Sequence, residues 1–138
     1  MCEQNVEIVR RGYAMFSAGD IEGAAEMFAE DTEIPGAGGL GVPDSTDGTR
    51  LGPEGFLRSV ADTQAAFEDY RVKTDELIAV GDAVVVPVRI LGRERDNGAR
   101  LEMCGAHLWV LRDGVVVQGE VYRTAEEALQ VARLLTLA

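Results

Sequence analysis

The sequence predicts an α+β domain in which helices cover one curved antiparallel sheet. Up to about residue 67 the apolar residues recur every three or four positions, which is the period of a helix. From Tyr70 onward they recur at every second position, which is the period of a strand. Residues 99–122 read as two long strands joined at Arg112-Asp113-Gly114, because Asp-Gly is a strong hairpin signal. With 138 residues, the chain is expected to form a single domain, 1–138.

Four helices are predicted from apolar stripes and from signals at their ends. The first carries Tyr13 and Phe16 on its apolar stripe. Pro53 suits the first turn of the third, and Thr124 forms a capping box with Glu127 at the start of the last. The predicted helices span residues 3–18, 21–29, 53–67 and 125–135.

The segment between the second and third helices has a different character. A short strand is predicted at 32–34, and residues 35–50 then hold five glycines and two prolines with no period. A loop this long inside a small domain is either disordered or a functional lid. Segment 35–50 is therefore a candidate cover for a binding site.

Four strands follow, and one of them carries the only histidine of the chain. They are predicted at 70–80, 83–95, 99–111 and 115–123. Because side chains alternate along a strand, the histidine shares one face with apolar neighbours. That face consists of Leu101, Met103, Gly105, His107, Trp109 and Leu111.

The turns predict how these strands pair. A two-residue loop at Asn97-Gly98 would place Val88 opposite His107. On the other face it would pair Arg93 with Glu102, a contact typical of a solvated sheet face.

The last turn leaves two registers open. A two-residue Asp-Gly loop would place Glu120 opposite His107, whereas a three-residue loop with Gly114 left-handed would place Gly119 there. We favour the second register, because the first would turn Gln118 and Glu120 into the apolar layer.

Composition and charge exclude several classes of function. The net charge of −11 argues against nucleic acid or an anionic membrane as a partner, and no apolar run approaches the ~18 residues of a membrane span. The start of the chain lacks the pattern of a signal peptide, and Cys2 and Cys104 form no metal or redox spacing. We therefore expect a cytoplasmic protein without a metal or cofactor.

Two stretches resemble a known family. Residues 13–34, Y-A-M-F-S-A-G-D-I-E-G-A-A-E-M-F-A-E-D-T-E-I, and residues 107–122, H-L-W-V-L-R-D-G-V-V-V-Q-G-E-V-Y, resemble SnoaL-like polyketide cyclases and ketosteroid-isomerase-like proteins. These families belong to the nuclear-transport-factor-2-like superfamily. The resemblance implies a cystatin-like α+β barrel, in which N-terminal helices wrap a curved sheet into a cone with an internal pocket. Segment 35–50 would then be a mobile cover over the mouth of the cone.

The catalytic residues of ketosteroid isomerases carry over poorly. Their helix-one tyrosine aligns with Gly12, beside Tyr13, and their aspartate base aligns near Gly36, which is not acidic. Their second aspartate aligns with His107.

The residues of this sequence match two other activities of the superfamily unequally. The acid of the epoxide hydrolases aligns with Val121, so that activity is not supported. SnoaL-like cyclases do place a histidine on the penultimate strand, which matches His107. Their last-strand acid would be Glu120, which the favoured register turns outward, and Glu33 is a further carboxylate whose direction stays open.

His107 has two readings, a site residue or a buried neutral imidazole of the core. An imidazole can act as a general acid or base near neutral pH. Tyr13 is likewise either a pocket hydroxyl or a core residue. The candidate catalytic residues are His107 and Tyr13, and the candidate substrate-binding residues are Trp109, Phe16, Val88, Met103 and Val121.

Three functions remain in view. The first is a cofactor-free acid–base enzyme of isomerase, cyclase, dehydratase or hydrolase type, acting on a small, apolar, oxygenated molecule. The second is a protein with the same pocket that only binds its ligand. The third is an interaction module, and the apolar outer sheet face predicts a homodimer packed sheet to sheet. That face bears Ala106, Leu108, Val110 and Tyr122.

Overall fold

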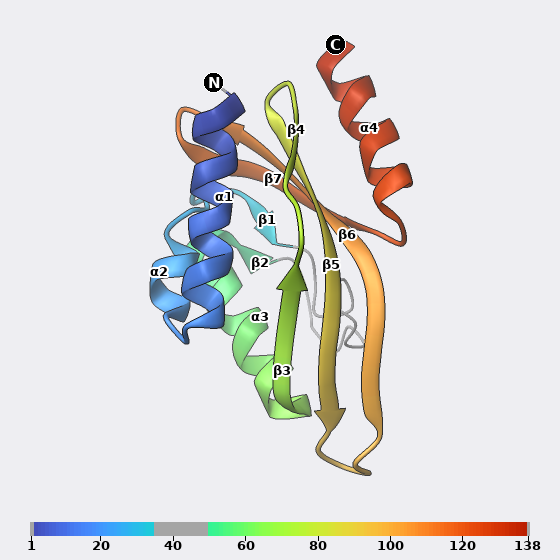
Figure 1. Cartoon of the computed structure of the whole chain (residues 1–138). Helices are drawn as coiled ribbons and strands as arrows, with labels where there is room; N and C mark the ends of the chain where they lie inside the picture. The colour runs from blue at the N-terminus through green and yellow to red at the C-terminus, as the bar shows by residue number, and fades with distance from the viewer. Residues whose placement is uncertain (1, 35–49, 138) are drawn as a thin grey trace.

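Three helices lie on one face of a curved antiparallel sheet and a fourth lies on the other, in a computed structural model of the chain (Figure 1). The structure describes residues 2–34 and 50–137, so the loop predicted at 35–50 lies outside the described residues except at its last position. In chain order the elements are α1 (Cys2–Ser17), α2 (Ile21–Ala25), β1 (Glu33–Ile34), β2 (Arg50–Leu51), α3 (Gly52–Ala66), β3 (Phe67–Thr74), β4 (Ile78–Val80), β5 (Ala83–Glu94), β6 (Arg100–Arg112), β7 (Val115–Tyr122) and α4 (Ala125–Leu137).

The main sheet has the strand order β3-β5-β6-β7. Strand β4 continues the line of β3 and pairs with the same edge of β5. All of these pairings are antiparallel, and β1 and β2 form a separate two-stranded sheet. The sheet is curved and open, and the helices α1, α2 and α3 cover its inner face (Figure 1). The predicted α+β fold class is therefore confirmed.

Most predicted elements appear, with three differences. The strand predicted at 70–80 is two strands, β3 and β4, and the two-residue strand β2 was not predicted. Helix α2 ends at Ala25 rather than near 29, because the chain then turns to bond with β7. The amide of Val116 donates to the carbonyl of Met27 at 2.7 Å, and the amide of Ala29 donates to the carbonyl of Val116 at 2.9 Å.

The predicted pairing of β5 with β6 is wrong by two residues. Val86, not Val88, lies opposite His107, and Arg93 lies opposite Arg100 rather than Glu102. The cause is a four-residue loop, 95–98, in place of the two-residue turn: the amide of residue 94 donates to the carbonyl of residue 99 at 2.8 Å. Because the pairing is shifted by an even number of residues, each side chain stays on its predicted face of the sheet.

Neither predicted register of β6 and β7 is correct. Asp113 and Gly114, with φ of 53° and 84°, form a two-residue turn, and a bulge at Val117 then shifts the pairing by one residue. As a result His107 lies opposite Val121, rather than Gly119 or Glu120. The favoured facing is nevertheless right, because Gln118 and Glu120 are both exposed.

The sheet has an apolar cluster on each face. The inner cluster, beneath α1, α2 and α3, consists of Val9, Phe28, Val84, Val86, Val88, Ile90, Trp109, Leu111 and Val116. The outer cluster packs beneath α4 and includes Ala106 and Leu108, which are completely buried. The outer-face residues that predicted a dimer are thus largely covered within one chain, and the homodimer stays a prediction.

Candidate functional site

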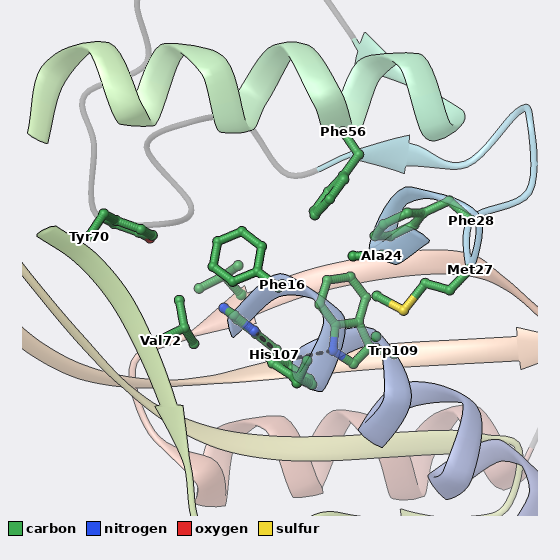
Figure 2. Close-up of a pocket in the computed structure, with 12 residues that line it drawn as sticks. Phe16, Ala24, Met27, Phe28, Phe56, Tyr70, Val72, His107 and Trp109 are labelled. Carbon is green, nitrogen blue, oxygen red and sulfur yellow. Dashed lines mark hydrogen bonds between the residues drawn. The ribbon is translucent and has the colours of Figure 1, made fainter. Parts of the chain in front are cut away.

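A small cavity of about 50 Å³ lies between the inner sheet face and the helices α1, α2 and α3. Its lining residues are almost wholly apolar and aromatic, and the polar side-chain groups among them are the His107 imidazole, the Trp109 indole N–H and the hydroxyls of two tyrosines (Figure 2). The lining residues are Gly12, Tyr13, Phe16, Ala24, Met27, Phe28, Phe56, Tyr70, Val72, His107, Trp109 and Val121.

Three of these residues form one hydrogen-bonded chain. The hydroxyl of Tyr13 lies 2.6 Å from Nδ1 of His107, and the indole Nε1–H of Trp109 donates to that hydroxyl at 2.9 Å. His107 and Trp109 share a face because they stand two residues apart on β6, and Tyr13 reaches them from α1. The Tyr13 and His107 rings stack at 13° with their centroids 6.0 Å apart.

Aromatic packing holds this chain of residues in place. Phe28 packs edge to face on Trp109, with the ring centroids 5.7 Å apart, and it packs against Phe56 with the centroids 4.9 Å apart. The backbone hydrogen bonds of residues 27–29 with Val116 set the position of Phe28. The buried hydroxyl of Thr32 also donates to the carbonyl of Val116, at 2.6 Å. The segment after α2 is therefore fixed to β7, and two of its side chains, Met27 and Phe28, line the cavity.

Burial keeps the titratable groups of the cavity uncharged. His107 is only 3% exposed, and desolvation lowers its pKa from 6.5 to about 4. Desolvation also raises the pKa of Tyr13, against a smaller opposing effect of the Trp109 hydrogen bond, and it raises the pKa of Tyr70. At neutral pH all three side chains are neutral.

The second ring nitrogen of His107 has no partner. Among the described residues, Nε2 is the buried side-chain nitrogen or oxygen without a hydrogen bond. In Figure 2 this end of the ring points away from Trp109, toward Phe16 and Val72. A buried polar atom without a partner is costly, so its position at a cavity calls for a functional explanation.

The structure brings together five of the seven predicted site residues. His107, Tyr13, Trp109, Phe16 and Val121 all line the cavity.

Val88 and Met103 do not line the cavity. Val88 is a buried core residue opposite Gly105, and Met103 lies opposite Ile90 with 38% of its surface exposed. Val88 was predicted to line the cavity because the predicted pairing of β5 with β6, which is wrong by two residues, placed it opposite His107. Met103 lies on the predicted face, but it is four residues along β6 from His107, beyond the end of the cavity.

Several lining residues were not predicted. Tyr70 and Val72 lie on one face of β3, and Phe28 and Phe56 lie on the apolar stripes of two predicted segments. The alternation along β3 was a signal that could have identified Tyr70 and Val72. Which apolar helix residues border a cavity, rather than fill a core, depends on inter-helix packing, which has no local signal.

No carboxylate lies on the described cavity wall. Glu33 and Glu120, the two acids whose direction the sequence left open, are both exposed. Within residues 2–34 and 50–137, no group of three or more His, Cys, Asp or Glu side chains could hold a metal ion. Over the same residues, no helix is long and apolar enough to cross a membrane.

Comparisons with known proteins agree on the fold. The SnoaL-like domain family matches residues 9–119. An NTF2-like protein of unknown function from Burkholderia pseudomallei superposes with a TM-score of 0.74 at 22% identity, over 94% of this chain and 97% of its own. A candidate SnoaL-like polyketide cyclase from Mesorhizobium loti gives 0.64 at 19% identity, over 84% of this chain and 96% of its own.

One further solved structure contains a small molecule. TerC, co-crystallised with polyporic acid, is 26% identical with a TM-score of 0.73, over 94% of this chain and 98% of its own. No curated protein matches the chain. The family match spans well over half of the 138 residues, and the fold and the solved relatives agree with it. This chain therefore belongs to the SnoaL-like domain family.

Proposed function

We propose that this protein takes a small, apolar, oxygen-bearing molecule into the His107 cavity and performs cofactor-free acid–base chemistry on it. The observation that carries the proposal is the unpartnered Nε2 of His107, a residue that lines an almost wholly apolar cavity. A nitrogen in this position can bond to one polar atom of a ligand, while the aromatic walls bury its apolar body. The co-crystallisation of TerC with polyporic acid and the naming of relatives as polyketide cyclases support a small-molecule ligand.

The size of the cavity limits how a ligand enters. A cavity of about 150 Å³ accommodates benzene, so a ring-sized ligand needs more room than the 50 Å³ present. Phe16 and Phe56 are half-buried, whereas Phe28 and Trp109 are buried. We infer that rotation of Phe16 and Phe56 makes the space, because these two phenylalanine rings are only half-buried.

Binding without chemistry is the second candidate function. Its support is the absence of a charged group from the described wall, since Tyr13, Tyr70 and His107 are all neutral at pH 7. An acid–base enzyme with a single neutral imidazole must take its second proton-transfer group from the substrate or from water.

His107→Gln distinguishes these functions from a purely structural histidine. If the cavity performs chemistry, turnover of a substrate found by screening cyclic ketones should fall at least ~100-fold, the usual scale for a positioned acid or base. If the cavity only binds, no member of the screen is turned over and the affinity for its ligands changes modestly.

A control variant separates the site from general stability. Leu108 adjoins His107 but is buried on the opposite face of β6, so Leu108→Ala should lower stability and leave ligand affinity unchanged. If His107→Gln also lowers stability, by about 1–3 kcal/mol, and leaves ligands unaffected, His107 is a core residue and the proposal fails.

We also propose that two copies of the chain form a homodimer through the part of the outer sheet face that α4 does not cover. This open face carries exposed side chains of β3, β5 and β6 around a shallow groove. Its support is the resemblance of the sequence to the nuclear-transport-factor-2-like superfamily, from which a homodimer packed sheet to sheet was predicted.

A further inference from the structure

The proton on the 2.6 Å bond between Tyr13 and His107 can lie on either partner, and its position decides what the cavity offers a ligand. If the hydroxyl donates, Nδ1 is bare and a neutral ring carries its proton on Nε2. If Nδ1–H donates, Nε2 is bare and is an acceptor. Nε2 of His107 thus offers a ligand either a hydrogen-bond donor or an acceptor, but never both.

Trp109 restricts the choice, because an indole nitrogen can only donate. Its Nε1–H occupies one acceptor position of the Tyr13 oxygen at 2.9 Å. The part of the chain that the structure describes gives the Tyr13 hydroxyl no third partner. The proton of that hydroxyl therefore has one acceptor within reach, which is Nδ1 of His107.

Counting unsatisfied groups separates the two arrangements. With the proton on Tyr13, Trp109, Tyr13 and Nδ1 are all satisfied, and only the Nε2–H awaits a partner. With the proton on Nδ1, the hydroxyl proton of Tyr13 and the bare Nε2 are both left without a partner. Unsatisfied buried groups are costly, so the first arrangement is the more stable.

We propose that Tyr13 and Trp109 are positioning residues that hold His107 in its Nε2–H tautomer, so that His107 presents a hydrogen-bond donor to the ligand and selects a neutral molecule with an acceptor oxygen, such as a carbonyl. This inference rests on the proposed function, because it concerns a ligand of the same cavity. It assigns Trp109 a role beyond forming a wall: the indole directs the tyrosine proton, and the tyrosine sets the tautomer. The burial that lowers the pKa of His107 supports it, since a cationic ring would carry protons on both nitrogens.

The ligand class follows from what the wall lacks. No described lining residue is a cation, so a carboxylate ligand would bury its charge in an apolar cavity with no opposite charge to balance it. A ligand whose polar group can only donate would face the Nε2–H with no acceptor. A neutral carbonyl oxygen satisfies the Nε2–H and leaves no charge buried.

A direct test is available because the chain has one histidine. In protein labelled with ¹⁵N-histidine, NMR shows whether the bridging proton has a one-bond coupling to nitrogen. We expect no such coupling at Nδ1, and a protonated Nε2 as the single tautomer. A one-bond coupling at Nδ1 would overturn the proposal.

Two variants and a matched control test the positioning roles. Tyr13→Phe should convert the single tautomer into a mixture, and Trp109→Phe should shift it in the same direction by less. Tyr122→Phe removes a hydroxyl from the outer face and should leave the tautomer unchanged. A Tyr13→Phe protein that folds and keeps a single Nε2–H tautomer would show that Tyr13 does not set it.

A ligand pair tests the selection for an acceptor. Acetophenone and α-methylstyrene have similar shapes, but only the first has an acceptor oxygen. The affinity ratio of acetophenone to α-methylstyrene should fall at least ~10-fold from wild type to His107→Leu, the effect of one lost hydrogen bond. An unchanged ratio would refute the ligand class.

The outcomes separate the two proposals. Binding of these probes with the bridging proton on Nδ1 would overturn this inference and leave the proposed function standing. The expected tautomer with neither probe bound at millimolar concentration would count against the cavity as a ligand site, and would leave the positioning roles of Tyr13 and Trp109 supported.

Discussion

His107 is a titratable residue that the fold keeps neutral. The imidazole is 3% exposed, and desolvation lowers its pKa to about 4, below the range in which histidine usually titrates. Its hydrogen bond to Tyr13 fixes the ring without supplying a charge. We therefore expect ligand binding to be independent of pH between about 6 and 8, since Tyr13 and Tyr70, with raised pKa values, also stay neutral there.

The lowered pKa also predicts how stability depends on pH. Between pH 6.5 and about 4 the unfolded chain binds a proton at His107 and the native protein does not, so stability is lost as the pH falls through this window. In urea unfolding, wild type should lose about 2–3 kcal/mol more than His107→Gln between pH 7 and pH 4.5. The carboxylates are the same in both proteins, so the difference isolates the histidine. Equal losses would contradict the buried neutral imidazole.

At the scale of elements, the start of α3 depends on a glycine. Gly52 has φ +66°, and a Cβ there would lie 2.5 Å from the carbonyl oxygen of Glu30, a backbone atom that cannot rotate away. The amide of Gly52 also donates to the carbonyl of Thr32 at 2.8 Å. This close approach connects α3, and with it Phe56, to the segment that leaves α2.

Gly52→Ala should therefore lower the free energy of unfolding by about 2–4 kcal/mol, from left-handed strain and the backbone clash together. Gly98→Ala is the matched control, because Gly98 has φ +72° with nothing within 4 Å of its Cβ position. That change should cost only about 1 kcal/mol. Equal losses in thermal or urea unfolding would show that the contact with Glu30 relaxes freely.

The sequence predicted this architecture well wherever a local signal exists. Apolar periods identified α1 and α3, a capping box identified α4, and alternation along β6 placed His107 and Trp109 on one face. The pairing of β5 with β6 was missed because Asn97-Gly98 also suits the end of a four-residue loop, in which Gly98 takes the left-handed conformation. Nothing local in the sequence signals that the chain after α2 pairs with Val116, and so the position of Phe28 could not be predicted.

At the scale of the whole molecule, charge is unevenly distributed. The chain has a net charge of −11, yet the groove on the outer sheet face that α4 leaves open is lined by five exposed cations and two acids. Arg89 pairs with Glu102 at 2.8 Å, and this contact lowers the pKa of Glu102. The cations are Arg71, Lys73, Arg89, Arg93 and Arg100.

A homodimer formed through this open face would bring the two sets of cations together. We therefore expect association to strengthen as salt screens the repulsion, by several-fold in Kd between about 50 mM and about 500 mM salt. Light scattering at micromolar concentration measures the mass. Lys73→Ala with Arg93→Ala should weaken the salt dependence, whereas Arg10→Ala, on α1, should not affect it. A monomeric mass at both salt concentrations would rule out the dimer.

The bulge at Val117 has a consequence for how a cavity of this kind can change during evolution. The turn at Asp113-Gly114 alone would align the strands so that Glu120 faces His107 across the sheet, and the one extra residue reverses the facing of all that follows. Pairing the last strand without the bulge, at unchanged length, would therefore bring a carboxylate opposite the imidazole. A one-residue insertion beyond the bulge would do the same, whereas deletion of Val117 would remove the bulge and keep Val121 opposite His107. In this fold, the register of the last strand decides whether the reaction centre is charged or neutral.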